Sequence, residues 1–226
     1  MKQTILYFMA GLFLLTGCAK EELSLAEGNQ VGYLTVEDLI LQQAEQISVG
    51  SRAVDADLYV EITDTKATTT YKHGAVPAKI ELAVGNCTVK AYNAAYKDNT
   101  PNTAKYYAET KVEIKEGKVE YLSLEVPMVN YGVTLSLPDN FSAWFSDYTF
   151  SIGKSAATET FSLKEDEVIY FDYQKGDVLS YSLKVTSKEE AFTQTGSYGS
   201  DEGKAIESGK IYQIIYNWET KALEMN

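Results

Sequence analysis

Cys18 is the side chain of this sequence with the clearest chemical role, because of the residues that precede it. Lys2 is followed by an apolar segment from Ile5 to Leu15, and Thr16-Gly17 lie directly before the cysteine. A charged start, a short apolar run and small residues before a cleavage point are typical of a secretory signal, and this run is too short to span a bilayer. The sequence therefore predicts that residues 1–17 are a signal peptide and that Cys18 begins the mature chain.

The thiol of Cys18 is also expected to carry lipid. The motif Leu14-Leu15-Thr16-Gly17-Cys18 resembles the bacterial lipobox, in which the cysteine receives a diacylglycerol. Acyl chains such as palmitate contribute about 0.8 kcal/mol per buried CH₂, so a multiply acylated Cys18 would hold the protein on a membrane without a spanning helix. The next residues, Ala19-Lys20-Glu21-Glu22, are similar to the signal that sends Bacteroidota-type lipoproteins to the outer face of the outer membrane. We expect a lipid-anchored surface protein with residues 18–30 as its tether.

Residue constellations for catalysis or cofactor binding are not recognisable in the sequence. His73 lies in Tyr71-Lys72-His73-Gly74, which is typical of a turn, and no nucleophile with an orienting carboxylate accompanies it. The mature chain has too few His and Cys residues for zinc, and it has no phosphate loop or dinucleotide fingerprint. We interpret the acidic runs Asp55-Ala56-Asp57 and Glu165-Asp166-Glu167 as surface charge, because neither matches a calcium loop. The expectation is a protein that is not an enzyme and has no cofactor or metal; only a cluster of buried carboxylates in a cleft would favour a hydrolase.

Trp144 is the candidate for ligand binding. It lies in Phe141-Ser142-Ala143-Trp144-Phe145, between Asp139-Asn140 and Asp147-Tyr148. A ring on such a loop could stack on the face of a sugar. The competing interpretation, which the energy of aromatic burial favours, is that these rings form a short turn covering the protein core.

Composition limits the partners and the compartment. The formal net charge of the 226-residue chain is −12, so nucleic acid and anionic lipid head groups are disfavoured partners. Once Cys18 is acylated, Cys87 is the one thiol left, and no disulfide is expected. The length is sufficient for two β domains with cores of their own.

The elements that must position these residues are predicted to be β-strands almost throughout. Apolar and polar residues alternate in Leu58–Thr63, Ile80–Val84 and Cys87–Ala91, and Gly85-Asn86 predicts that the last two form a hairpin. Gly196–Gly203 is predicted to be a loop. Further alternating segments predict an all-β fold of two tandem β-sandwiches, an N-terminal one over residues 31–127 and a C-terminal one over residues 128–226, separated near Pro127–Tyr131. These further segments are Val112–Ile114, Leu122–Met128, Val133–Leu137, Tyr148–Ile152, Phe161–Leu163, Val168–Tyr170, Leu179–Val185 and Ile211–Trp218.

Three segments of the sequence resemble a known family. They are Gly32-Tyr33-Leu34-Thr35-Val36, Ser51-Arg52-Ala53, and Ile80-x-Leu82-x-x-Gly85-Asn86-Cys87-Thr88-Val89-Lys90-Ala91. Together they look like an uncharacterised family of Bacteroidales surface lipoproteins similar to fimbrillins, the subunits and anchors of adhesive pili. The resemblance implies two transthyretin-like β-sandwiches in tandem, a role in adhesion or pilus assembly, and other fimbrillin-like subunits or host and cell-surface glycans or proteins as partners.

Arg52, the one arginine in the chain, has a special place in this resemblance. In fimbrillins a surface protease cuts after an arginine behind the first strand, and another subunit then donates a strand to the groove. Carried over, the removable strand is Tyr33 to about Leu41, with Leu34 and Val36 as inward plugs and Ile211–Trp218 as the candidate donated segment. The alternatives are a solvated linker arginine in a fixed pilus anchor or tip protein, and a glycan-binding lipoprotein that assists polysaccharide uptake across the outer membrane.

Overall fold

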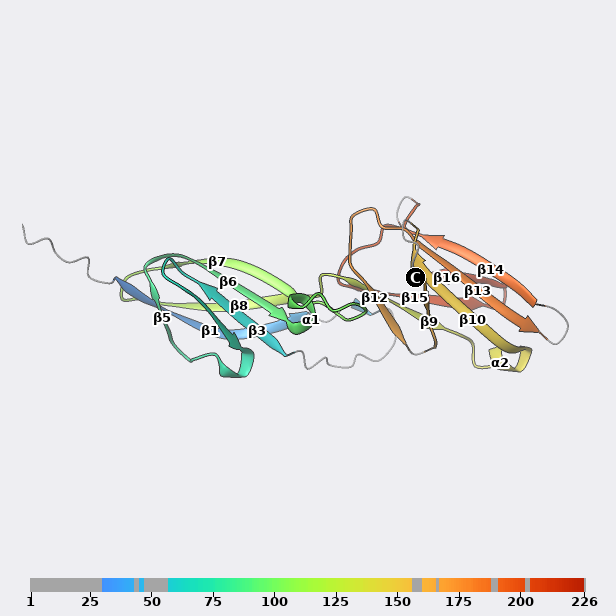
Figure 1. Cartoon of the computed structure of the whole chain (residues 1–226), viewed down its shortest axis with the longest axis horizontal. Helices are drawn as coiled ribbons and strands as arrows, with labels where there is room; N and C mark the ends of the chain where they lie inside the picture. The colour runs from blue at the N-terminus through green and yellow to red at the C-terminus, as the bar shows by residue number, and fades with distance from the viewer. Residues whose placement is uncertain are drawn as a thin grey trace, which may run out of the picture.

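The computed structural model describes residues 30–42, 45–46, 57–155, 160–165, 167–187, 191–201 and 204–225. Figure 1 shows two β-sheet units that follow one another along the long axis of the molecule. Strands dominate both units, which confirms the predicted all-β fold of tandem sandwiches. The expected signal peptide, Cys18 and Arg52 lie outside the described residues.

The first unit consists of two sheets that bury one face each. In β3, alternate residues are fully buried, as the sequence predicts, and the core between the sheets contains Leu34, Val60, Ile62 and Val89. One sheet has the order β5-β1-β8 and the other β4-β3-β6-β7. The strands are β1 (Val31–Gln42), β3 (Leu58–Thr63), β4 (Thr68–Lys72), β5 (Ile80–Ala83), β6 (Gly85–Asn93), β7 (Tyr107–Ile114) and β8 (Val119–Pro127), with short helices η1 (His73–Ala75) and α1 (Ala94–Lys97).

The hairpin predicted at Gly85-Asn86 is wrong. β5 pairs with β1 in one sheet, whereas β6 pairs with β3 and β7 in the other. Gly85 has a φ of 124°, which L side chains rarely adopt, and it turns the chain from one sheet into the facing one. Alternation predicted which residues face the core but carried no information on which strands are hydrogen-bonded.

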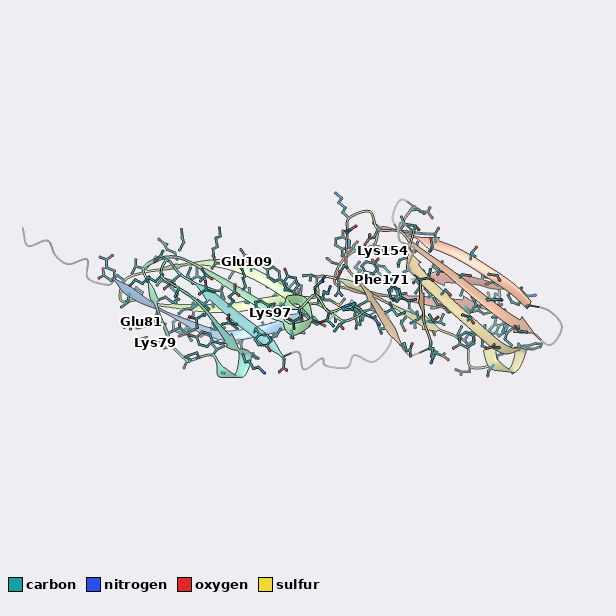
Figure 2. All side chains as sticks on the ribbon, in the orientation of Figure 1. Lys79, Glu81, Lys97, Glu109, Lys154 and Phe171 are labelled. Atoms are coloured by element: carbon teal, nitrogen blue, oxygen red, sulfur yellow. The ribbon has the colours of Figure 1, made fainter. Side chains whose placement is uncertain are left out.

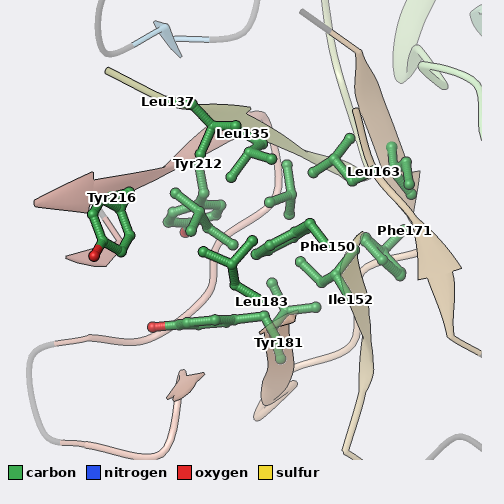
Figure 3. Close-up of a cluster of buried hydrophobic side chains, with 14 of the residues drawn as sticks. Leu135, Leu137, Phe150, Ile152, Leu163, Phe171, Tyr181, Leu183, Tyr212 and Tyr216 are labelled. Carbon is green, nitrogen blue, oxygen red and sulfur yellow. The ribbon is translucent and has the colours of Figure 1, made fainter. Parts of the chain in front are cut away.

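The second unit also has two sheets, with the orders β11-β10-β13-β14 and β12-β9-β15-β16. Figure 3 shows side chains of both sheets, among them Phe150, Leu183 and Tyr212, gathered in the core between them. The elements are β9 (Tyr131–Ser136), α2 (Phe141–Trp144), β10 (Phe145–Lys154), β11 (Phe161–Ser162), β12 (Val168–Phe171), β13 (Leu179–Ser187), β14 (Ala191–Tyr198), β15 (Lys210–Asn217) and β16 (Ala222–Met225).

The loop predicted at Gly196–Gly203 is wrong for its first residues, which end strand β14. A Cβ at Gly196 would lie 2.4 Å from the ring of Tyr181 on the neighbouring strand β13. This glycine therefore admits a ring against the backbone of the strand and does not mark a turn.

The first two described ranges, 30–42 and 45–46, pair with strands of different units. β1 pairs in parallel with β8, and β2 (Glu45–Gln46) pairs in parallel with β15 of the second unit. An apolar cluster with residues of both units, including Leu58, Tyr106 and Ile211, lies at the junction. No helix among the described residues is long and apolar enough to cross a membrane.

Candidate functional site

Strand β1 is the first candidate site, and its inward side chains fill the core of the first unit. Leu34 is fully buried among the residues of the core cluster, and Val36 is half-buried against the same cluster. Both side chains therefore face inward, in the orientation that a plug requires. Burying a leucine side chain contributes roughly 1.5–3 kcal/mol, so a unit without β1 would leave a costly apolar groove.

The backbone of β1 is equally involved, because β1 is the central strand of its sheet. It pairs antiparallel with β5 from Val31 to Leu34 and parallel with β8 from Tyr33 to Gln42. Removal of β1 would leave unpaired backbone groups on both neighbours, facing the same gap. A gap of this kind accepts an extended segment by strand addition.

The start of β1 is closely seated against the turn between β7 and β8. A Cβ at Gly32 would lie 2.3 Å from the carbonyl oxygen of Lys115, so a glycine is required at this close approach. The backbone N–H of Tyr33 donates to the oxygen of Lys118 over 2.8 Å, and the N–H of Gly117 donates to the oxygen of Val31 over 2.9 Å. These contacts hold the strand in a single register.

The segment expected to be donated, Ile211–Trp218, is mostly strand β15 in the structure. β15 lies between β9 and β16, and its residue Ile214 is fully buried. Withdrawal of this segment would therefore open the core of the second unit. The last strand, β16, lies at the end of its sheet order and has half-buried apolar residues.

The aromatic motif around Trp144 is the second candidate site. Phe141 is buried, and its ring centroid lies 4.6 Å from that of Phe145 and 5.2 Å from that of Tyr216. This ring covers the core, as the competing interpretation expects. Trp144, in the same short helix, is 63% exposed.

Trp144 has ordered aromatic support. The ring centroids of Trp144 and Trp218 are 6.4 Å apart in an edge arrangement, and Trp218 stacks on Phe145 at 5.9 Å. The indole Nε1–H of Trp218 donates to Oδ1 of Asn140 over 2.8 Å. Sequence reasoning missed Trp218 and Asn140 as partners of Trp144, although Asn140 directly precedes the motif. Together they make an exposed ring on a fixed base, which is an arrangement suited to stacking on a sugar.

The exposed Trp144 lies far from the start of the described chain. In Figure 1, β1 begins in the first unit, and α2 lies at the end of the second unit that is remote from the first. A tether attached before β1 would therefore present Trp144 away from its point of attachment.

Within the part of the chain that the structure describes, residues with catalytic or metal-binding potential are not brought together. His73 is exposed in η1, and the described residues contain no group of three His, Cys, Asp or Glu side chains that could hold a metal ion. Burial raises the pKa of the Cys87 thiol to about 11, helped by the Asp64 carboxylate, so this thiol is not an activated nucleophile. Burial opposes ionisation of Asp64, but backbone N–H groups, including that of Ala83 at 2.8 Å, lower its pKa.

Comparison with known proteins gives a family match over most of the chain. A family model described as "Domain of unknown function (DUF4493)" matches residues 30–224. A search of curated proteins gives no match.

Several solved structures match this chain over most of its length. A "putative cell adhesion protein" from Bacteroides eggerthii is 11% identical, with 83% of this chain and 85% of that chain covered and a TM-score of 0.48. A fimbrilin from Porphyromonas gingivalis is 12% identical, with 81% and 89% covered and a TM-score of 0.45. A further "putative cell adhesion protein", from Bacteroides ovatus, is 13% identical, with 85% and 94% covered and a TM-score of 0.43.

Proposed function

The chain belongs to the family described as "Domain of unknown function (DUF4493)", and for this member we propose a non-enzymatic role as a lipid-anchored, fimbrillin-like adhesin of the cell surface. In this proposal Cys18 carries the lipid in the outer membrane, and residues 31–127 and 128–226 form the two domains. The protein is either a pilus subunit or a pilus anchor or tip component. The observation that carries the proposal is the place of β1 at the centre of its sheet, between β5 and β8.

In strand exchange, a segment of another subunit would replace β1 between β5 and β8. Cleavage after Arg52 would leave the fragment that contains β1 held by non-covalent contacts alone, among them the ladders of β1 with β5 and β8, the pairing of β2 with β15 and the burial of Leu34. An incoming segment would pair with both neighbours and place apolar side chains in the positions of Leu34 and Val36. The incoming segment would take the place of β1 and cover the core of the first unit again.

Cleavage would also change the attachment of the protein. The lipid on Cys18 and strand β1 both precede Arg52, so they belong to the same fragment. An uncut chain keeps its lipid and its first strand, as an anchor requires. A cut chain leaves the membrane when β1 is displaced, as a polymerising subunit requires.

The test is digestion of the folded mature chain, residues 18–226, with an arginine-specific protease, followed by intact mass and size analysis. We expect one cut, after Arg52, followed by release of the fragment that contains β1 and growth into oligomers. The matched control is the Arg52→Lys variant, which keeps the charge and should resist this protease. A chain that is cut but stays monomeric with β1 in place would contradict strand exchange.

A second candidate function, glycan binding, is favoured by the exposure of Trp144. In this role the remote end of the second unit would stack on surface polysaccharide, and the protein would assist an outer-membrane uptake system or adhere to host glycans. The test is binding to immobilised polysaccharides by Trp144→Ala. Tyr121→Ala is its matched control, because Tyr121 is 65% exposed but lies on β8 of the first unit. Loss of binding in the first variant alone would support the role, and equal binding by both variants would contradict it.

A further inference from the structure

The junction of the two units contains a pocket that neither strand exchange nor the Trp144 group uses. Its volume is about 240 Å³, and residues of both units line it. Asn102 and Lys105 come from the first unit, and Lys154, Phe161 and Asp172 come from the second. Figure 2 shows Lys154 and Phe171, which also lines the pocket, close together in the second unit.

Lys105 gives the pocket a fixed, buried charge. Its side chain is 7% exposed, and its Nζ lies 2.6 Å from Oδ1 of Asp172, so the ion pair joins the two units. The same Nζ donates to Oδ1 of Asn99 over 2.5 Å. The backbone N–H of Lys105 donates to the side-chain oxygen of buried Asn130 over 3.0 Å. The ammonium group is therefore held in place before any ligand arrives.

Asp172 provides an acceptor beside this ammonium. Its side chain is 63% exposed although Oδ1 is paired with Lys105, which leaves room for a ligand hydroxyl. The Nζ of Lys154 donates to the backbone oxygen of Asp172 and lies 2.8 Å from Oδ2 of Asp177. These contacts fix the loop after β12 that carries the carboxylate.

The pocket is also lined by aromatic side chains. The Phe161 ring lies edge to face with Phe171 at 5.7 Å, and both line the pocket. The N–H of Tyr170 in β12 donates to Oδ1 of Asn102 over 2.8 Å. This hydrogen bond holds the loop of the first unit that carries Asn102 against β12. The pocket thus combines apolar ring carbon with an ordered donor and acceptor.

This combination matches the chemistry of a sugar. One hydroxyl of a vicinal pair can donate to the Asp172 carboxylate while the other accepts from the Lys105 ammonium, and the C–H face of the ring can contact Phe161. A phosphate or carboxylate ligand fits poorly, because it would meet the charge of Asp172 beside the ammonium. The volume is below the range of about 300–1,000 Å³ typical of drug-sized ligands, so it suits a single ring.

We propose that the junction pocket binds one neutral hexose unit through the Lys105–Asp172 ion pair and the Phe161 ring. This site is separate from Trp144, which lies at the remote end of the second unit, and it does not depend on exchange of β1. The ligand would contact both units at once.

The test is NMR of the ¹⁵N-labelled mature chain titrated with the methyl glycosides of glucose, galactose, mannose and N-acetylglucosamine. At about 50 mM each sugar exceeds a millimolar Kd. We expect at least one of them to shift the side-chain amide signals of Asn102 and Asn130. Shifts of these signals by none of the four sugars would overturn the proposal.

Two variants and one control separate this site from the remote one. Asp172→Asn keeps an acceptor for Lys105 but loses the carboxylate, and Phe161→Leu loses the ring; each should weaken binding about tenfold. Unchanged spectra away from the pocket show that each variant is folded. Trp144→Ala should leave the affinity unchanged. Equal affinity in all three variants, or loss of the Asn102 and Asn130 shifts in Trp144→Ala alone, would contradict the proposal.

Discussion

Phe141 and Trp144 are three residues apart in one short helix but have opposite surroundings. Phe141 is buried under the rings of Tyr148, Tyr216 and Trp218, whereas Trp144 is mostly exposed. We expect Phe141→Ala to lower the free energy of unfolding by about 3 kcal/mol or more, and Trp144→Ala to lower it by less than about 1 kcal/mol. Urea denaturation of both variants measures the difference. Equal losses would mean that Trp144 also belongs to the core.

Cys87 makes the stability of the first unit depend on pH in alkaline solution. Its pKa is raised by burial to about 11, from an ordinary value of 9.0. Between these two values the unfolded chain loses the thiol proton while the folded chain keeps it. The contribution is therefore complete below about pH 9 and is lost as the pH rises toward 11, by at most about 1.4 kcal/mol per pH unit.

The Cys87→Ala variant tests this dependence. We expect it to be less stable than the parent near neutral pH, because it leaves a small cavity, but to lose less stability on going from about pH 8 to about pH 10.5. Tyrosines with raised pKa values, such as Tyr131 and Tyr170, are present in both chains and cancel in the comparison. Urea denaturation at the two pH values gives the measurement. An identical pH dependence in both chains would show that the thiol is not responsible.

At the scale of the element, β1 is held by a glycine at its start. A Cβ at Gly32 meets the backbone of Lys115, so Gly32→Ala must displace β1 or the β7–β8 turn. We expect this variant to lose about 1–3 kcal/mol of stability and to show faster amide hydrogen exchange along β1.

Gly74→Ala is the matched control for Gly32→Ala, because a Cβ at Gly74 meets no atom within 4 Å. It should exchange like the parent chain. If amide hydrogen exchange in Gly32→Ala also matched that of the parent chain, β1 would be held less tightly against the β7–β8 turn than the close contact of Gly32 with Lys115 indicates.

The sequence could predict which strand faces are buried, but not which strands pair. Alternation in Leu58–Thr63 correctly placed Leu58, Val60 and Ile62 on the buried face of β3, because burial of one face is a local property. It could not predict that β5 and β6 belong to different sheets, since strand pairing depends on how Gly85 directs the chain. The Asn102, Lys105 and Asp172 group escaped sequence analysis for a related reason: its members lie on segments up to 70 residues apart, which only the packing of the two units brings together.

In the whole molecule, strand β1 begins in the first unit, and helix α2 with Trp144 lies at the end of the second unit that is remote from the first (Figure 1). The predicted lipid attachment residue Cys18 precedes β1 in the sequence. In the sequence, Arg52 follows both β1, which pairs in the first unit, and β2, which pairs in the second. Loss of the residues before Arg52 would therefore affect sheets of both units at once, and would detach the folded units from the proposed lipid.

A peptide exchange measurement decides whether β1 is a replaceable strand. The mature chain is cut at Arg52 and incubated with a labelled synthetic peptide of residues 31–42, and the incorporated label is followed with time. We predict incorporation of this peptide in place of β1, and none of a peptide with Leu34→Asp, because a charge would enter the apolar seat. Failure of the parent peptide to enter the cut chain, or equal incorporation of both peptides, would contradict the account.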